Sequence, residues 1–425
     1  MKIYENPNKE ELQKILTRPI LEQVDLNTIV EEVFDQVALN GDNALKQLTQ
    51  KFDKAELENI EVTEQEINTA SNQIDDSLKN AIKEAYKNIY LFHKKQLEAP
   101  IKIETSPGVI CWRKSVGIEK VGLYIPGGSA PLFSTILMLA IPAKIAECKE
   151  IVLCTPCDSD GKVNPAILFT AKLCGISRVF KLGGIQAIAA MTLGTESVPA
   201  VYKIFGPGNQ YVTAAKLYAQ KFKVAIDMPA GPSEVMVVCD ENANEKYVAS
   251  DLLAQAEHGA DSQVILVSTN VEKAQQIKQE LEIQLAKLPR KTQASGALEN
   301  SAAIVSKKEN IIAIVNSYAP EHLILNTEFN DFLIENISNA GSVFIGQYTP
   351  ESAGDYASGT NHTLPTNGYA KQYSGVSVDS FVKKITFQEI SKEGLLNLGK
   401  TIEIMAEAEG LEAHKNAVSI RLKDL

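Results

Sequence analysis

Between residues 119 and 227, short runs of apolar and β-branched residues alternate with longer segments whose apolar positions recur every three or four residues. The short runs are typical of buried strands and the longer segments of amphipathic helices. A second alternation of the same kind begins at residue 233 and continues to about residue 346. Because regular alternation of strands and helices favours parallel sheets covered by helices, we expect an α/β protein with two Rossmann-like parallel-sheet modules.

The segments that flank the two modules have other patterns. Residues from about 8 to 97 are rich in Glu, Lys and Gln at helical spacing, and they predict a peripheral N-terminal helical layer. His93 stands beside two lysines near the end of one of these helices, where a solvated cation is expected. Residues 101–115 alternate like a hairpin. Residues from about 391 onward are helical again and predict a small helical C-terminal tail.

These patterns divide the chain into four parts. We expect the N-terminal helical layer and the hairpin in residues 1–117, a first α/β module in 118–230 and a second in 231–366. The tail, residues 367–425, is detached from both modules and could dock on a partner subunit. Two successive α/β modules suggest a cleft between them, which is the usual place for a small-molecule site.

Composition limits the classes of function. The 425 residues are 44% hydrophobic and 22% charged, as in an ordinary globular protein. A net charge of −11 offers no field that would attract nucleic acid or an anionic membrane. Without a signal peptide or an apolar membrane-spanning stretch, a cytoplasmic location is expected. The six cysteines are irregularly spaced, so we expect reduced thiols, and the Cys154–Cys157 pair is interpreted as structural.

Glycine-rich turns follow three strands of the first module, at residues 126–129, 183–184 and 206–209. At the carboxyl ends of parallel strands, such turns let backbone N–H groups approach a phosphate. None has the G-x-G-x-x-G spacing, so simple strand-to-helix turns are an equal alternative for each. Tyr124 and Gln186 lie beside two of these turns and Asn209 ends the third, so all three are placed to bind a ligand.

A predicted helix that begins near residue 245 closes with DLLAQAEHG, in which Gly259 is expected to be the C-cap. Gln255 and His258 are three residues apart, a spacing that puts both on one helix face. They can form half of a metal site, or His258 can simply complement the negative end of the helix dipole. This stretch alone favours the second alternative.

Further candidate residues lie in separate segments. Glu321 and His322 stand at the entrance of a strand, where they point to opposite faces or reach one cavity together. Asp355 lies in residues 346–366, a predicted loop whose length suggests a function. The tail contributes Glu409 and His414. If these segments converge, Gln255, His258, Asp355 and His414 form a nitrogen and oxygen ligand set of the kind that zinc accepts.

Six motifs of this chain resemble the histidinol dehydrogenase family, and the resemblance runs along nearly the whole sequence. They are VGLYIPGGSAPLFST, IFGPGNQYVTAAK, DMPAGPSEVMV, DLLAQAEHG, YAPEHL and GDYASGTNHTLPT. The resemblance implies a four-electron dehydrogenase of histidine biosynthesis that oxidises L-histidinol through L-histidinaldehyde to L-histidine. Two NAD molecules would be used in turn, with one zinc ion per subunit, in a homodimer whose tail reaches the partner's active site.

Individual roles are carried over by the same resemblance. It implies zinc bound by Gln255, His258, Asp355 and His414. It implies Glu321 and His322 as the acid/base pair, and Tyr124, Gln186 and Asn209 as NAD-binding residues. The substrate site would be lined by Ser233, Gln255, His258, His322, Asp355, Glu409 and His414. Glu409 and His414 would come from the partner subunit.

The residue types suit this chemistry, since an imidazole can take the alcohol proton and a carboxylate can activate water for aldehyde hydration. Two rival classes stay open on the residues alone. A zinc hydrolase would use Glu321 to activate water on a carbonyl, and would have no use for the first module. A non-catalytic nucleotide-binding or assembly protein would leave Glu321, His322 and the metal ligands without a joint purpose.

Overall fold

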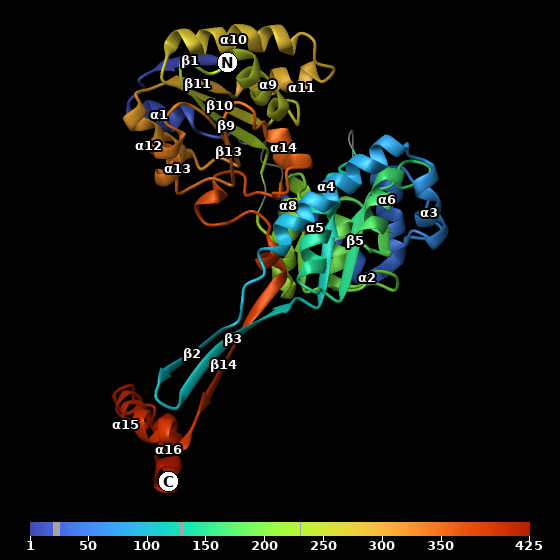
Figure 1. Cartoon of the computed structure of the whole chain (residues 1–425). Helices are drawn as coiled ribbons and strands as arrows, with labels where there is room; N and C mark the ends of the chain where they lie inside the picture. Colours follow the sequence, from blue (N-terminus) through green and yellow to red (C-terminus); the bar gives the residue numbers. More distant parts are fainter. Residues whose placement is uncertain (20–25, 128–130, 230) are drawn as a thin grey trace.

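A computed structural model describes residues 1–19, 26–127, 131–229 and 231–425, so Gly128 and Ser129 of the first glycine-rich turn lie outside the described residues. Two α/β modules and a long arm make up the molecule (Figure 1). The expected fold class is confirmed, because each module is built on a parallel sheet. None of the helices described is both long and apolar enough to cross a membrane. The cytoplasmic location stays a prediction.

The first module carries a parallel sheet in the order β6-β5-β4-β7-β8. Its strands are β4 (Lys120–Tyr124), β5 (Glu150–Thr155), β6 (Arg178–Lys181), β7 (Lys203–Phe205) and β8 (Ala225–Ile226). One face is covered by α3 (Glu64–Thr69), α4 (Asp76–Lys94), α5 (Phe133–Ile145) and α6 (Pro165–Leu173). The other face is covered by α2 (Leu26–Asp53), α7 (Gly184–Leu193) and α8 (Gln210–Ala219). Burial on both faces explains why these strands are continuous apolar runs.

The second module has a six-stranded parallel sheet in the order β1-β11-β10-β9-β12-β13. Its strands are β1 (Lys2–Glu5), β9 (Glu234–Cys239), β10 (Gln263–Ser268), β11 (Ala302–Val305), β12 (His322–Asn326) and β13 (Ser342–Ile345). Helices α9 (Glu245–Ala256), α10 (Val271–Leu285) and α11 (Lys291–Glu299) cover one face. Helices α1 (Lys9–Ile15), α12 (Lys308–Tyr318) and α13 (Asn330–Asn336) cover the other.

The N-terminal residues differ from the single peripheral layer expected for residues 1–117. Strand β1 pairs with β11 at the edge of the second sheet, and α1 packs on the same module. Helices α2, α3 and α4 instead belong to the core of the first module. His93 in α4 is fully buried, with Nδ1 2.8 Å from the Ile89 carbonyl and Nε2 3.2 Å from the Asn361 amide, so the solvated role expected for it is wrong.

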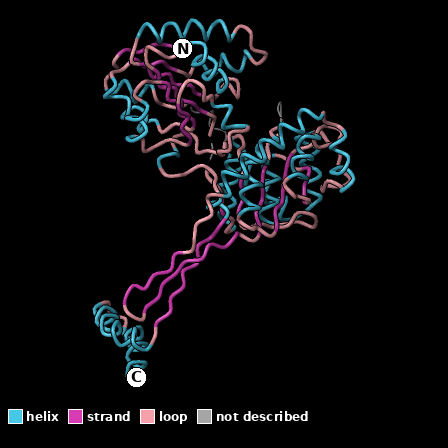
Figure 2. The backbone as a smooth tube through the Cα atoms, in the orientation of Figure 1, coloured by secondary structure: helices cyan, strands magenta, loops and turns pink. Residues whose placement is uncertain are grey.

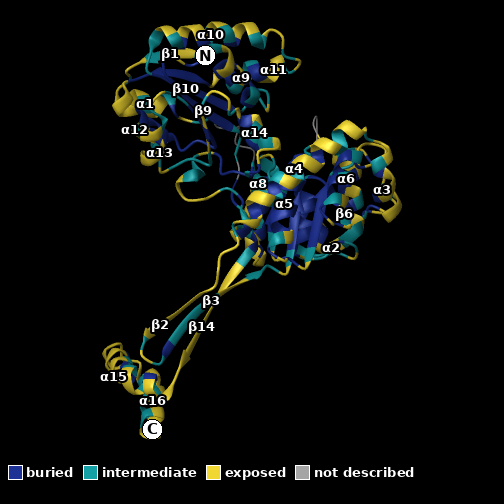
Figure 3. Ribbon diagram, in the orientation of Figure 1, coloured by how far each residue is buried: buried dark blue, intermediate teal, exposed yellow. Residues whose placement is uncertain are grey.

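The arm is an antiparallel sheet of β2 (Ile101–Ser106), β3 (Val109–Gly117) and β14 (Val382–Ile390), which confirms the predicted hairpin and adds a third strand. It extends away from both modules and ends in α15 (Lys392–Ala408) and α16 (Glu412–Lys423) (Figures 1 and 2). Figure 3 shows that much of the arm is exposed, in contrast to the buried sheets. No residue of α16 is buried. The arm therefore presents apolar surface that one chain alone does not cover.

A buried ion pair holds the turn that follows β7. The Lys216 ammonium lies 2.5 Å from Asp227, and both side chains are almost fully buried. Lys216 donates to the Gly206 carbonyl at 2.8 Å, and the Gly206 N–H donates to Asp227 at 2.8 Å. Gly206 has φ of +130°, and a Cβ there would collide with the Tyr124 carbonyl. The turn that leads to Asn209 is thus fixed by contacts to both backbone polar groups of Gly206.

We predict that Lys216→Met lowers the free energy of unfolding by about 3–5 kcal/mol, because it leaves the Asp227 carboxylate buried without a cation to balance its charge. Urea denaturation measures the change. Lys120→Met is the matched control, since Lys120 pairs with Glu150 at 3.4 Å on a partly exposed surface. That variant should lose less than about 1 kcal/mol. Equal losses in the two variants would contradict the role given to the buried pair.

Candidate active site

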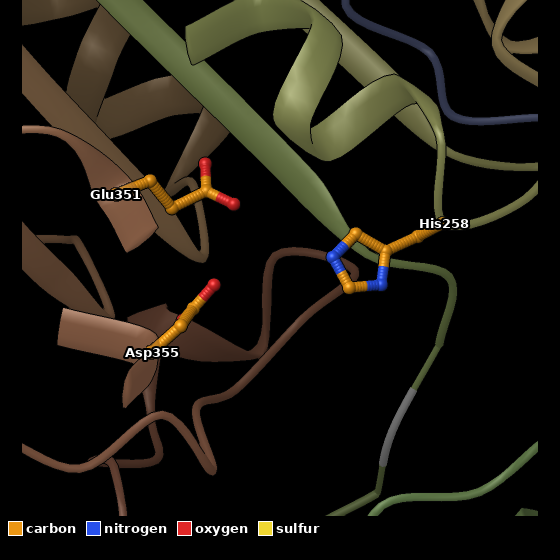
Figure 4. A group of neighbouring side chains, drawn as sticks. All are labelled: His258, Glu351 and Asp355. Carbon is orange, nitrogen blue, oxygen red and sulfur yellow. The ribbon is translucent and has the colours of Figure 1, made fainter. Parts of the chain in front are cut away.

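Three side chains with metal-binding chemistry meet at the edge of the second module's sheet where β9, β10 and β12 begin. The ligand atoms of His258, Glu351 and Asp355 lie within 4.8 Å of one another, and the three side chains point toward one another in Figure 4. Glu351 and Asp355 come from α14 (Glu351–Tyr356), where a spacing of four residues puts both carboxylates on one helix face. The stretch 346–366, expected as a loop, therefore contains the helix that supplies two of the three groups.

Gln255 lies against this group from the last turn of α9. With its amide nitrogen toward Glu351, it donates a hydrogen bond to Glu351, and its oxygen accepts one from the Glu234 N–H at 3.0 Å. Rotation of the amide would turn its oxygen toward the carboxylates, as a metal ligand requires. Helix α9 ends at Ala256 with Glu257 as the C-cap, so the C-cap expected at Gly259 is wrong and His258 follows the helix.

The donor set fits a divalent cation. Gln255, His258 and Asp355 are three of the four expected ligands, and Glu351, which the sequence interpretation missed, joins them. Among the described residues, no Lys or Arg forms an ion pair with Glu351 or Asp355. The signal that could have revealed Glu351 is the run Pro350-Glu351, which starts a short helix with a second carboxylate four residues later.

Glu321 and His322 converge beside the same carboxylates. Both are buried where β12 begins, and Nδ1 of His322 lies 3.6 Å from Oε2 of Glu321. Nε2 of His322 lies 3.4 Å from Oδ1 of Asp355. The residue before this segment, Ala319, has a left-handed backbone with φ of +55° and is followed by Pro320, which redirects the chain out of α12. Of the two arrangements considered for the Glu–His pair, the side chains adopt the one in which they come together.

The protonation of this cluster is set by its burial and its like charges. Burial raises the pKa of Glu321 to about 7. Burial also raises the pKa of Glu351, with Asp355 and Glu321 adding to the effect. Burial lowers the pKa of His322, but the carboxylates of Glu351, Glu321 and Asp355 outweigh it and raise that pKa to about 10. The three carboxylates thus favour the protonated form of His322.

An ion pair from the N-terminal segment fixes the backbone beneath the Glu–His pair. Arg18 reaches Glu234 through Nε at 2.5 Å and Nη2 at 2.8 Å, and Nη2 also donates to the Tyr318 carbonyl at 2.8 Å. The N–H of Glu234 donates to Oε2 of Glu321 at 3.0 Å. Its carbonyl lies 3.3 Å from Nδ1 of His322. Nothing in the local sequence pattern pointed to Arg18.

The three residues expected to bind NAD lie together at the carboxyl ends of the strands of the first module. Tyr124, Gln186 and Asn209 line one open cavity of about 1180 Å³. The Gly184 N–H donates to the Tyr124 hydroxyl at 3.1 Å, and Asn209 caps the N-terminus of α8 through its side-chain oxygen. Cys157 lines the same cavity, but burial raises the pKa of its thiol to about 11, in keeping with a structural role.

A second cavity, of about 580 Å³, joins the two modules. Ser233 and His258 line it from the second module, and Asn209 and Tyr211 line it from the first. Asn209 and Tyr211 also line the larger cavity. The two cavities therefore meet at Asn209 and Tyr211.

The described chain does not bring Glu409 and His414 to this site. Glu409 is the C-cap of α15 and His414 lies in α16, at the far end of the arm. Figure 1 shows both helices well away from the modules. One subunit thus holds three of the four expected metal ligands together with Glu351, and the expected fourth is out of reach.

Comparison with known proteins gives a consistent result. The sequence model described as histidinol dehydrogenase matches residues 16–422. Histidinol dehydrogenase from Bacteroides thetaiotaomicron is 57% identical over the full length of both chains, and that from Campylobacter jejuni is 52% identical over 100% of this chain and 99% of its own. The crystal structure of histidinol dehydrogenase from Elizabethkingia anophelis is 57% identical, with a TM-score of 0.98 over 100% of this chain and 98% of that one.

We predict that Glu351→Gln lowers the affinity of the protein for Zn²⁺ by about 10- to 100-fold, because a neutral amide replaces a buried carboxylate of the donor set. Competition with a chromogenic chelator measures the affinity. Glu257→Gln removes the same charge beside His258 without entering the group, and should stay within about twofold of the unchanged protein. Equal affinities of the two variants would remove Glu351 from the site.

Proposed function

This chain belongs to the histidinol dehydrogenase family, and on that premise we propose that it oxidises L-histidinol to L-histidine with bound zinc and two molecules of NAD. As a member it is an oxidoreductase of histidine biosynthesis that acts on a small molecule. Membership also removes the two rival classes, the zinc hydrolase and the non-catalytic nucleotide-binding protein. What is proposed beyond membership is the metal, the cofactor, the residue roles and the shared site.

One observation carries the proposal. The group of Gln255, His258, Glu351 and Asp355 lies directly beside Glu321 and His322, and the cavity at His258 shares Asn209 and Tyr211 with the one lined by Tyr124 and Gln186. A substrate held at the first group would face an acid/base pair on one side and a cofactor on the other. That is the arrangement that hydride transfer from an alcohol requires.

The Glu–His pair supplies the proton transfers of both oxidations and of the hydration between them. In the first oxidation, His322 accepts the hydroxyl proton as hydride leaves for NAD, which gives the aldehyde and NADH. Glu321 then removes a proton from water as the water adds to the aldehyde carbon, and His322 returns its proton to the carbonyl oxygen, which gives the hydrate and leaves His322 neutral again. In the second oxidation His322 takes a proton from the hydrate as a second hydride leaves, and the product is the carboxylic acid. No cysteine is needed, in agreement with the raised pKa values of the buried thiols.

His322 must be neutral to accept a proton, yet the nearby carboxylates raise its pKa to about 10. Glu351 and Asp355 are two of the three causes, and both belong to the proposed donor set. Neutralisation of these two carboxylates by a cation lowers the pKa of His322 again. Glu351 and Asp355 therefore couple metal binding to deprotonation of His322, which must be neutral to act as a base.

Zinc, when bound, would hold the imidazole and the amine of the substrate and so act mainly by positioning. Gln255, His258, Asp355 and the partner's His414 are the proposed ligands, with Glu351 beside them. Ser233 lines the cavity next to His258 and is placed to contact the substrate. Glu409 lies five residues before His414 on the arm, so an arm that brings one residue to a site brings the other close to it.

The arm supports a homodimer with shared active sites. Apolar side chains on its two terminal helices are exposed, among them Leu396 at 58%, Met405 at 60% and Ile420 at 51%. Exposed apolar surface of this kind marks a contact with another protein surface. A second copy of the chain that covers it would also place a tail near the partner's incomplete donor set, as the position of His414 requires.

We predict two NADH per molecule of L-histidinol when the protein is mixed with excess NAD. Absorbance at the NADH band measures the yield. Chelation should abolish the activity, because it removes the charge that positions the substrate and lowers the pKa of His322, and added Zn²⁺ should restore it. One NADH per histidinol, or full activity after verified removal of metal, would refute the proposed reaction.

If the two subunits share their active sites, dimers formed from two different inactive variants should regain activity. Glu321→Gln and His414→Asn should each be nearly inactive alone, but subunits mixed by unfolding and refolding should recover about a quarter of the normal activity. Half of the dimers are then hybrids, and each hybrid has one site with both native residues.

Sites built within one chain would give no recovery at all, and this outcome would contradict sharing. As a control, Glu321→Gln mixed with His322→Asn should stay inactive, because both changes lie on the same subunit's contribution to a site. Size-exclusion chromatography of each mixture checks that dimers have formed.

A further inference from the structure

The loop that follows α14 in the second module is bound to helices of the first module. Asn88 in α4 donates a hydrogen bond to the carbonyl of Ala357, the C-cap of α14, at 3.0 Å. Two residues later, Gly359 has φ of +121°, and a Cβ there would lie 3.0 Å from the Asn88 carbonyl oxygen. Glycine suits both this backbone angle and the close approach, so the loop runs directly against α4.

Asn361 lies at the centre of this contact. Its side chain is 8% exposed, and its amide nitrogen donates to the Met138 carbonyl of α5 at 2.6 Å. The same nitrogen lies 3.2 Å from Nε2 of His93 in α4, and the amide oxygen accepts from the Thr363 N–H at 2.9 Å. Because a carbonyl can only accept and an N–H can only donate, these partners fix the orientation of the amide.

His93 meets this amide as a neutral acceptor. Its ring is fully buried, and Nδ1 lies 2.8 Å from the Ile89 carbonyl, so Nδ1 carries the proton and Nε2 accepts from Asn361. Burial lowers the pKa of His93, in keeping with an uncharged ring. A buried polar network in which every group is paired stabilises one arrangement of the elements that it joins. Here those elements are α4 and α5 of the first module and the loop of the second.

The same loop connects this network to the candidate active site. Nδ1 of His362 lies 2.8 Å from the Asp355 carbonyl, and its Nε2 lies 3.1 Å from the Thr135 hydroxyl of α5. Asp355 and Glu351 belong to the proposed donor set, whereas the residues proposed to bind NAD lie in the first module. A shift of the loop on α4 and α5 therefore moves the donor set relative to the cofactor cavity. Hydride transfer needs reacting atoms within about 3.5 Å of each other, so it depends on this placement.

We propose that Asn361 and His93 form a clamp between the two modules, which holds the proposed donor set at the distance from the cofactor that hydride transfer requires. Both are positioning residues, since neither is among the residues that line the cavities at Tyr124 and His258. This inference rests on the proposed dehydrogenase reaction. NAD would bind within the first module, and the zinc ligands of this chain all lie in the second. The clamp therefore affects the step that needs both modules and leaves the binding of each ligand unchanged.

Two substitutions at His93 separate the clamp from the fold of α4. His93→Met fills a similar volume but offers Asn361 only a weak thioether acceptor, whereas His93→Gln places an amide oxygen where Nε2 now lies. Thr170→Val is the matched control, because Thr170 is fully buried in α6 of the same module and its hydroxyl donates to the Ala166 carbonyl at 2.7 Å.

The first measurement is hydride transfer in a single turnover, followed by stopped-flow absorbance of NADH in zinc-loaded, full-length protein with saturating L-histidinol and NAD. We expect His93→Met to transfer hydride about tenfold or more slowly, and His93→Gln and Thr170→Val to stay within about threefold of the unchanged protein. Calorimetry with NAD and chelator competition for Zn²⁺ should give unchanged affinities in every variant.

The second measurement tests the clamp without catalysis. Deuterium uptake by peptides that cover residues 357–363, in protein free of NAD, reports how often the loop opens. His93→Met should increase the exchange rate of this segment by about tenfold or more, because it takes one partner from the buried amide of Asn361. His93→Gln and Thr170→Val should leave that rate unchanged.

The contrary outcomes can be told apart. An unchanged rate of hydride transfer in His93→Met, or an equal loss in His93→Gln, would refute the clamp and leave the proposed reaction standing. A fall in NAD affinity together with the rate would also refute it, because His93 would then act only within the first module. If the unchanged protein forms no NADH, the proposed reaction fails by itself, and amide exchange decides whether the clamp exists.

Discussion

The ion pair between Arg18 and Glu234 is the contact on which the rest of the site depends. Its two hydrogen bonds fix the residue that begins β9, and the N–H and carbonyl of that residue face Glu321 and His322. A buried ion pair contributes little net stability unless its geometry is good, and here the guanidinium is bidentate and lies 4.0 Å above the Tyr318 ring. The ion pair therefore serves mainly to position the backbone of Glu234, and it connects the N-terminal segment to the end of the second sheet where Glu321 and His322 lie.

Next to this backbone, several buried carboxylates lie close together. Glu321, Glu351 and Asp355 stand around His322, and burial raises the pKa values of Glu321 and Glu351. Burial raises the pKa of Asp355, but its contact with His322 outweighs burial and lowers it. A site of this kind is neutralised either by protons or by a cation, so its acid/base chemistry and its metal affinity cannot be varied independently.

The sequence was sufficient for the α/β architecture, because strands buried on both faces and amphipathic helices have distinct periods over many residues. It also placed Tyr124, Gln186 and Asn209, since parallel strands expose their carboxyl ends at one edge. Features that depend on distant partners escaped it. Helix α14 is only six residues long and lies in a run rich in Gly and Ser, and β1 is a four-residue strand whose place is set by its pairing with β11.

The arm carries one further consequence. Strand β14 is held by β3, which ends at the first module, so the reach of His414 is set by a part of the molecule that holds none of the other proposed ligands. If the partner's His414 completes each site, association of two chains and binding of the metal are linked equilibria, and each must strengthen the other by the same factor. Dilution of the enzyme then weakens its hold on zinc, and loss of zinc favours separation of the subunits.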